Sequence, residues 1–145
     1  QVKDVASRLF AMGVDEISLG DTIGAGVPTD VERLLDELLH DFNARQLAMH
    51  FHDTRGTALA NVVKSLEMGI TVFDSAAGGL GGCPYAKGAS GNVATEDLLY
   101  LFAQMGIETG IDFDRIIQAA KQIEKTIGRP LASHQMEIHR MAGGA

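Results

Sequence analysis

Two histidines, His50 and His52, are placed where they could bind a metal ion. They follow an apolar run and are separated by one residue, so on a β-strand both imidazoles would point to the same face. Two imidazoles on one face can chelate a divalent cation, and the next residue, Asp53, could accept a ring N–H as a supporting partner. Because H-x-H is a short motif, the alternative of two partly exposed histidines at a strand–loop junction stays open.

A glycine-rich segment, residues 78–92, holds the one cysteine of the chain, Cys83. Its sequence, GGLGGCPYAKGASGN, contains six glycines, which disfavour a helix or a packed strand because each glycine loses much conformational entropy on ordering. We therefore expect a loop, in which a thiol could act in catalysis or proton transfer and free backbone N–H groups could cradle an anion. Burial of Cys83 as a small apolar side chain is the alternative.

Three further polar residues lie at or near the ends of expected strands, loops or helices. Asp21 ends an apolar run as Gly20-Asp21-Thr22, and it is either a turn residue or part of a site. Asn92 closes the glycine-rich segment before an expected helix, where its default role is that of an N-cap. Glu96 falls in the first turn of that helix, where a carboxylate interacts favourably with the helix dipole.

These residues must be positioned by strands and helices that alternate along the chain. Short apolar runs predict strands at residues 16–21, 46–52 and 70–77. Helical spacing of apolar residues predicts helices at residues 1–12, 31–42, 59–66, 95–105 and 113–127. Thr29 and Glu32 have the spacing of a capping box, with Pro28 just before it. The tail from Ala132 has no clear period, so no element is assigned to it.

This alternation predicts parallel βαβ units and an α/β fold. The strands begin roughly 25–30 residues apart, which suits a TIM (β/α)₈ barrel or a doubly wound sheet. Polar residues follow all three strands, and barrels place their active sites at that edge, which favours the barrel. Three strands cannot close a barrel of eight. Residues 1–145 are therefore predicted to form a partial TIM-barrel catalytic domain, about its second half, with residues 132–145 as a tail.

Composition limits the function classes. The net charge of −7 argues against a nucleic-acid or anionic-membrane surface, although local donors could still bind a small anion. No apolar run approaches the roughly 20 residues that span a bilayer. A single cysteine excludes an internal disulfide and fits a reducing compartment. The N-terminus has no signal-peptide pattern and no initiating Met, and it begins within a helical pattern as if something preceded it.

Three sequence blocks together resemble 3-hydroxy-3-methylglutaryl-CoA lyases. They are SLGDTIG at residues 18–24, HFHDT at residues 50–54 with Gly56 and ALAN at residues 58–61, and the glycine-rich segment running into ATED at residues 94–97. The histidine block is shared with related metal-dependent barrel enzymes such as isopropylmalate and homocitrate synthases. The cysteine-containing segment is much more specific to the lyases, and the resemblance covers nearly the whole chain.

The resemblance implies a lyase that cleaves 3-hydroxy-3-methylglutaryl-CoA to acetyl-CoA and acetoacetate, in leucine degradation and ketone-body formation. It also implies a location in the bacterial cytoplasm or, in a eukaryote, in the mitochondrial matrix. It implies that a divalent cation, Mg²⁺ or Mn²⁺, is bound by His50, His52 and Asn92. It also implies that Cys83 takes part in catalysis and that Asp21 lies in the same site. Five further positions are assigned with it, Thr22, Gly81 and Gly82 to substrate binding and Asp53 and Glu96 to support of the site.

These residue types suit a retro-Claisen cleavage, in which a tertiary hydroxyl loses a proton and a thioester enolate gains one. A divalent cation can hold the hydroxyl and lower its pKa. A glycine-rich loop can close over the substrate and exclude water, which makes the enolate easier to stabilise. His50 is predicted to be a metal ligand and a proton-transfer group, and Cys83 the proton donor or relay.

The chain departs from the lyases in one respect. Their acidic metal ligand and a neighbouring catalytic arginine come from a first barrel strand that has no counterpart in this sequence. The expected partners are therefore an acyl-CoA substrate and the missing N-terminal half of the barrel, and a homodimer is also compatible with the resemblance. Two alternatives stay open: a condensing enzyme of the isopropylmalate or homocitrate synthase type, which would keep the histidines without needing Cys83, and an inactive half-barrel fragment.

Overall fold

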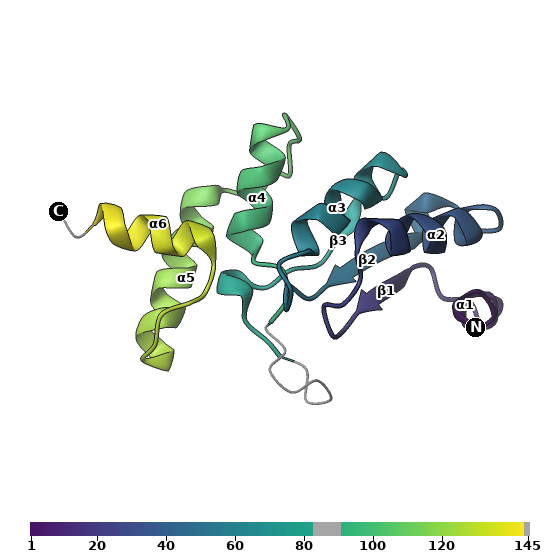
Figure 1. Cartoon of the computed structure of the whole chain (residues 1–145), viewed down its shortest axis with the longest axis horizontal. Coiled ribbons are helices and arrows are strands. Elements are labelled where there is room, and N and C mark those ends of the chain that lie inside the picture. The colour runs from purple at the N-terminus through teal and green to yellow at the C-terminus, as the bar shows by residue number, and fades with distance from the viewer. Residues whose placement is uncertain (83–90, 144–145) are drawn as a thin grey trace. The chain divides into compact units, whose positions relative to one another are not determined.

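The computed structural model describes residues 1–82 and 91–143, which divide between two compact units, residues 1–74 and 75–145 of the chain (Figure 1). In the part that the structure describes, every helix is too short or too polar to span a bilayer. In chain order the elements are α1 (Val2–Ala11), β1 (Ile17–Asp21), α2 (Pro28–Leu39), η1 (Ala44–Gln46), β2 (Leu47–Phe51), α3 (Ala58–Glu67), β3 (Val72–Phe73), η2 (Ala77–Gly79), α4 (Thr95–Gln104), α5 (Phe113–Ile127) and α6 (His134–Ala142).

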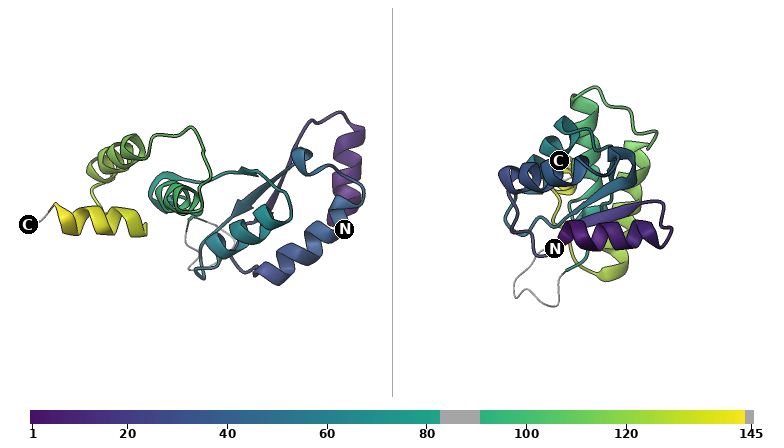
Figure 2. Two further views of the ribbon diagram at one scale, coloured as in Figure 1. Left: turned by 90° about the horizontal axis from the view of Figure 1, so that it is seen from above. Right: turned by 90° about the vertical axis from the view of Figure 1, so that its right-hand side faces the viewer.

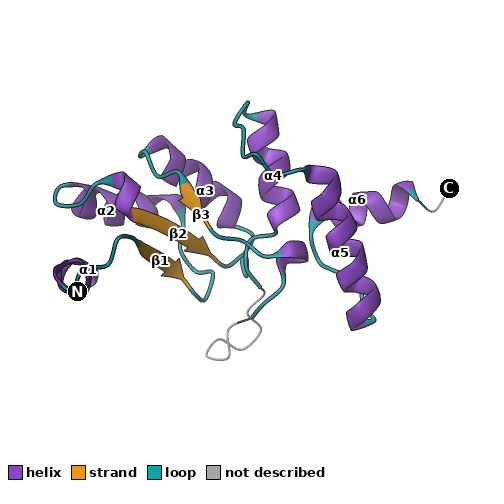
Figure 3. Ribbon diagram, turned by 180° about the vertical axis from the view of Figure 1, so that it is seen from behind, coloured by secondary structure: helices purple, strands orange, loops and turns teal. Residues whose placement is uncertain are grey.

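The first unit is built around three parallel strands in the order β1-β2-β3 (Figure 3). Strand β2 lies between the other two, so its register sets the alignment of both neighbours. This arrangement confirms the predicted parallel α/β fold. Strand β3 is shorter than the predicted range 70–77. The hydrogen bond from the Asp74 N–H to the Met49 carbonyl oxygen (3.3 Å) lies at its end, and beyond it the chain diverges from β2.

The two faces of this sheet differ because successive side chains alternate along a strand. Helices α2 and α3 lie on one face of the sheet (Figure 2). Leu47, Met49 and Phe51 of β2 are buried, and Met49 and Phe51 line a pocket together with residues of α2, which puts them on that face. The opposite face carries Gly20 of β1, which is exposed, and His50 of β2, which is half-buried. The histidine pair therefore belongs to the face turned away from these two helices.

Helix α2 begins at Pro28, and the predicted capping box of Thr29 and Glu32 is wrong. Proline suits the first helical position because its φ angle is already helical and its missing N–H would have no partner there. The cap therefore moves toward the N-terminus, where the Asp30 carboxylate accepts the backbone N–H of Val27 (3.2 Å).

The C-terminal tail, to which the sequence assigns no element, contains helix α6. Its apolar residues do not form a stripe: Met136 is fully buried, whereas Ile138 and Met141 are exposed. Met136 packs in a core cluster with residues of α5, and the hydroxyl of Ser133 caps the helix by accepting the Met136 N–H (3.2 Å). Tertiary contacts, which leave no periodic pattern, therefore stabilise this helix.

Glu96, in the first turn of α4, is completely buried. Its carboxylate accepts the backbone N–H of Gly78 (3.0 Å) and the hydroxyl proton of Ser133. It therefore ties the η2 turn and the start of α6 to α4, a tertiary role beyond the expected dipole effect. Asn92 is not the N-cap of α4, because the helix begins later and Ala94 occupies that position.

The two ends of the glycine-rich segment meet beside η2. Asn92 donates two hydrogen bonds to the Leu80 carbonyl oxygen, from its backbone N–H (3.2 Å) and from Nδ2 (3.1 Å). Gly91 is buried against the Gly79 carbonyl oxygen, and a Cβ on Gly91 would lie 1.9 Å from that oxygen. The close approach requires glycine at position 91. Cys83 and the rest of residues 83–90 lie outside the described residues.

Replacing Gly91 by alanine should therefore open the base of this loop. We expect Gly91→Ala to lower the free energy of unfolding by about 1–3 kcal/mol, because the added methyl group forces backbone apart in a tightly packed place. Thermal unfolding followed by circular dichroism measures the effect. Gly82→Ala is the matched control, since a Cβ there meets nothing within 4 Å. Equal melting temperatures for the two variants would contradict this assignment.

A second test concerns Asp97, whose carboxylate accepts the backbone N–H groups of His134 (3.0 Å) and Gln135 (2.8 Å) at the start of α6. Asp97→Asn turns one acceptor into an NH₂ group that faces a donor. We expect a loss of about 1–3 kcal/mol in the free energy of unfolding, measured by urea denaturation. Asp114→Asn removes the same charge from an exposed position of α5 and should have little effect. A similar loss in both variants would refute the capping role.

Candidate functional site

The two histidines lie side by side at the C-terminal end of β2. The His50 and His52 ring centroids are 5.0 Å apart, with the ring planes inclined at 60°. His52 is buried and follows the last residue of the strand, where its backbone N–H donates to the Asp21 carbonyl oxygen (3.2 Å). The i, i+2 spacing thus brings both imidazoles together at the end of the central strand, as the sequence predicts.

The carboxylate that is hydrogen-bonded to the His50 ring belongs to Asp74, not to Asp53. Asp74 Oδ1 lies 2.6 Å from His50 Nδ1. Asp53 Oδ1 accepts the backbone N–H of Ala58 (3.0 Å) and so caps the start of α3. The sequence analysis did not single out Asp74, which falls within the predicted strand at residues 70–77. The signal that identifies it is strand register, because Ala48 pairs with Val72 and the residues two positions further along are His50 and Asp74.

Asp21 organises the turn that follows β1. Its carboxylate accepts the backbone N–H groups of Ala25 (3.1 Å) and Gly26 (2.8 Å), and its carbonyl oxygen accepts that of Gly24 (3.3 Å). A Cβ on Gly26 would lie 3.0 Å from Asp21 Oδ2, so the small residue permits the carboxylate to reach the backbone. The neighbouring Thr22 is exposed.

The loops after β1 and β2 are joined by side chains that sequence reasoning did not single out. Arg55 Nη1 donates to the carbonyl oxygens of Ile23 (3.2 Å) and Gly24 (3.0 Å). Thr57 Oγ1 and Asn61 Nδ2 both donate to the Gly26 carbonyl oxygen, each at 3.0 Å. Because these loops carry Asp21 and His52 at their starts, the bonds hold the two strand ends in one arrangement.

In the second unit, Asn92 has an unusual environment. Its side-chain nitrogen is bonded to Leu80, but its Oδ1 atom is buried and has no hydrogen-bond partner among the described residues. Gly81 has a φ of 109°, and a Cβ there would lie 2.9 Å from Asn92 Nδ2. Gly82 is exposed. A buried amide oxygen without a donor costs free energy unless another group, such as a cation, uses it.

The donor types of these residues suit a divalent cation. In the first unit, His50 and His52 are adjacent imidazoles. In the second unit, considered by itself, Asn92 has a buried amide oxygen. Mixed nitrogen and oxygen ligands are compatible with Mg²⁺ or Mn²⁺ when further oxygen ligands complete the shell. Over residues 1–82 and 91–143, no cluster of three or more His, Cys, Asp and Glu side chains is arranged to hold a metal. The described part of this chain therefore offers an incomplete ligand set.

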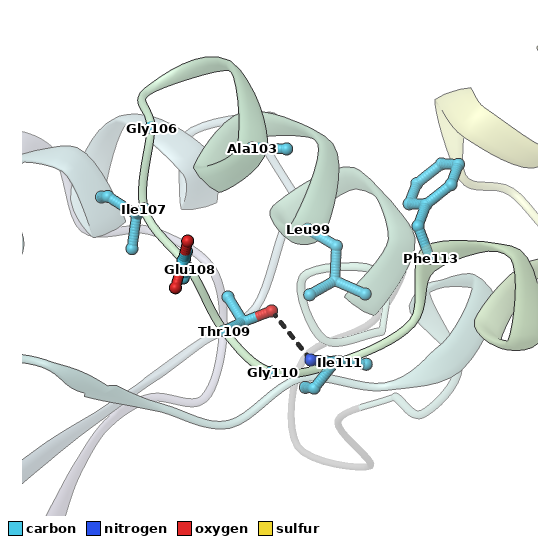
Figure 4. A pocket seen from close by; sticks show the side chains of 9 residues that line it. All are labelled: Leu99, Ala103, Gly106, Ile107, Glu108, Thr109, Gly110, Ile111 and Phe113. Atoms are coloured by element: carbon cyan, nitrogen blue, oxygen red, sulfur yellow. Dashed lines mark hydrogen bonds between the residues drawn. The ribbon is translucent and has the colours of Figure 1, made fainter.

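A cavity of about 500 Å³ in the second unit is a different kind of feature (Figure 4). It lies between α4 and the connection to α5 and includes none of the predicted site residues. Its lining is mostly apolar, and the hydroxyl of Thr109 is already used, since it accepts the Ile111 N–H (3.3 Å). The lining residues are Leu99, Ala103, Gly106, Ile107, Glu108, Thr109, Gly110, Ile111 and Phe113.

Comparison with known proteins places these features in a family. The HMGL-like family model matches residues 1–123. The chain is 55% identical over 140 residues to the hydroxymethylglutaryl-CoA lyase YngG of Bacillus subtilis. The aligned region covers 97% of this chain and 47% of that protein. It is 50% identical over 129 residues to the cytoplasmic 3-hydroxy-3-methylglutaryl-CoA lyase of Homo sapiens. That aligned region covers 89% of this chain and 35% of the human protein.

Solved structures agree. The crystal structure of the Bacillus subtilis HMG-CoA lyase matches with a TM-score of 0.92 at 55% identity, over 96% of this chain and 47% of that chain. An HMG-CoA lyase from Acinetobacter baumannii, in complex with coenzyme A and 3-methylmalate, matches with a TM-score of 0.89 at 40% identity, over 94% of this chain and 45% of that chain. This chain therefore has part of the TIM-barrel-like fold of these lyases.

This chain spans about half the length, or less, of the lyases that it matches. The matches nevertheless extend over most of this chain. The family model reaches residue 123 and so includes both histidines and the glycine-rich segment, and the Bacillus subtilis relative covers 97% of the chain. The agreement of the family model, the relatives and the solved structures is sufficient to conclude that this chain belongs to the HMGL-like family.

Proposed function

We propose that this chain forms about the second half of the (β/α)₈ barrel of a 3-hydroxy-3-methylglutaryl-CoA lyase, which cleaves its substrate to acetyl-CoA and acetoacetate. The observation that carries the proposal is the pair of adjacent imidazoles, His50 and His52, at the C-terminal end of a parallel strand. That edge is where barrel enzymes place their active sites. Identity of 55% to a Bacillus subtilis lyase supports the assignment of the reaction.

The metal is proposed to be bound by His50, His52 and Asn92, with an acidic ligand from the N-terminal half of the barrel. A bound Mg²⁺ or Mn²⁺ would polarise the substrate oxygens and lower the pKa of the tertiary hydroxyl. His52 follows β2 directly, and its backbone is tied to the end of β1, because its N–H donates to the Asp21 carbonyl oxygen (3.2 Å). The orphaned Oδ1 atom of Asn92 is the feature of the second unit that supports its role as a ligand.

The proton transfers are proposed to involve other groups. When the bond between C2 and C3 of the substrate breaks, its electron pair passes to the thioester enolate, whose C2 carbon must gain a proton. Cys83 is the proposed donor or relay for that proton. Asp21 is proposed for the hydroxyl proton, because each of its carboxylate oxygens receives one backbone N–H and keeps a lone pair.

The glycine-rich segment is proposed to bring Cys83 to the substrate. Contacts of Gly91 and Asn92 with residues 79–80 fix the base of the segment in the second unit. Gly81 and Gly82 are proposed to offer backbone N–H groups to the substrate, as Thr22 would offer its hydroxyl. An acyl-CoA substrate is supported by the Acinetobacter baumannii lyase, which is in complex with coenzyme A.

Loss of the thiol distinguishes the lyase from a condensing enzyme that uses the same histidines. In a full-length protein containing this chain, Cys83→Ala should reduce the rate of acetyl-CoA formation by about 10²–10⁴-fold, the range typical of a lost general acid. Binding of Mn²⁺, followed by its electron paramagnetic resonance signal, should not change and serves as the control. Turnover of the variant near that of the parent protein would contradict the role of Cys83.

The 145-residue chain by itself should show little or no lyase turnover with Mg²⁺ or Mn²⁺. The reason is that the acidic ligand and the arginine of the first barrel strand are proposed to come from outside it. Joining the chain to a polypeptide that supplies the N-terminal half should restore cleavage, measured as acetyl-CoA released from 3-hydroxy-3-methylglutaryl-CoA. Robust cleavage by the chain alone would show that its own residues complete the site.

A further inference from the structure

We infer that Asp74 is a positioning residue, which holds the His50 imidazole with its proton on Nδ1 and its Nε2 lone pair free for a divalent cation. The inference rests on the proposed function for the identity of the cation. The contact that selects the tautomer lies within residues 1–74. Asp74 belongs to the same compact unit as His50, at the end of β3.

The first argument is chemical. Asp74 Oδ1 lies 2.6 Å from His50 Nδ1, a short distance even for a hydrogen bond to a charged group. An ionised carboxylate can only accept hydrogen bonds, so the proton of this bond has to be on Nδ1. In a neutral imidazole the other nitrogen then carries the lone pair. The carboxylate thereby selects which nitrogen can bind a cation, as carboxylates do beside many metal-binding histidines.

The second argument is positional. Asp74 stands next to His50 across the β2–β3 pair, and its backbone N–H is fixed by a bond to the Met49 carbonyl oxygen (3.3 Å). On the other side of the ring is Gly20 of β1, where a Cβ would lie 3.5 Å from His50 Cδ2. The His52 ring is a third neighbour. The His50 ring therefore has neighbours from β1, from the residue after β2 and from the residue after β3, and the last of these, Asp74, makes a directional bond to it.

The third argument separates positioning from stability. The Asp74 side chain is 55% exposed, whereas that of His50 is 24% exposed. A polar contact whose partners are this accessible contributes little to the free energy of unfolding, because water competes for both groups and screens them. Removing the carboxylate should therefore leave the fold intact while releasing the ring. A residue kept only for stability would show the opposite pattern.

The test is ¹⁵N nuclear magnetic resonance of histidine-labelled chain without metal, at a pH where histidine side chains are neutral. His50 should show a protonated Nδ1 and a bare Nε2 in the parent chain. Asp74→Ala and Asp74→Asn should both lose this single tautomer, since an alanine has no acceptor and an amide can also donate. Asp36→Asn, which removes an exposed carboxylate from α2, is the matched control and should leave the His50 signals unchanged. An unchanged His50 tautomer in both Asp74 variants would overturn the inference.

A second readout follows the cation. Titration with Mn²⁺ should broaden the His50 and His52 ring signals of the parent chain, and the Asp74 variants should need about 10- to 100-fold more Mn²⁺ for the same broadening. Equal Mn²⁺ dependence in parent and variants would overturn the positioning role toward the cation. Absence of broadening in the parent chain would instead overturn the proposed histidine ligands, while the tautomer measurement still decides whether Asp74 fixes the ring. A melting temperature of the Asp74 variants equal to that of the parent chain would support a role of Asp74 in positioning the His50 ring rather than in stabilising the fold.

Discussion

The parallel register of the three strands is the constraint on which the candidate site depends. Because β1 and β3 both pair with β2 in the same direction, their C-terminal ends reach one edge of the sheet. Asp21 ends β1, the histidine pair ends β2, and Asp74 follows β3. Strand pairing thus brings together groups that lie more than twenty residues apart in the chain. A slip of one residue would turn His50 to the face where α2 and α3 pack.

Around that edge, loop contacts fix what strand pairing alone leaves free. The turn after β1 is closed by the carboxylate of Asp21, and the next loop reaches back to it through Arg55, Thr57 and Asn61. The acceptors are mostly backbone carbonyl oxygens, so the contacts fix the path of the chain. The second unit uses the same principle, since Glu96 and Asp97 accept backbone N–H groups from η2 and α6. In both units, carboxylates thus organise the backbone by accepting its N–H groups.

The sequence was sufficient for features that local pattern determines. Apolar runs and helical spacing predicted the strands, helices α1 to α5 and the shared face of the histidines, because each depends on neighbouring residues. It was insufficient where a partner comes from elsewhere in the chain. Asp53, adjacent to His52, was the natural choice of supporting carboxylate, yet Asp74 makes the contact with His50 through strand register. Helix α6 was missed for the same reason, since the carboxylate of Asp97, on α4, accepts the first backbone N–H groups of the helix.

The contact between His50 and Asp74 also narrows the chemistry that His50 can perform. If Nδ1 carries the proton bonded to Asp74 and Nε2 faces a cation, no nitrogen of the ring keeps a lone pair for a substrate proton. The role in proton transfer that the sequence analysis predicts for His50 then conflicts with its role as a ligand. The proposed division of labour follows: the histidines hold the cation, whereas Asp21 and Cys83 exchange protons with the substrate.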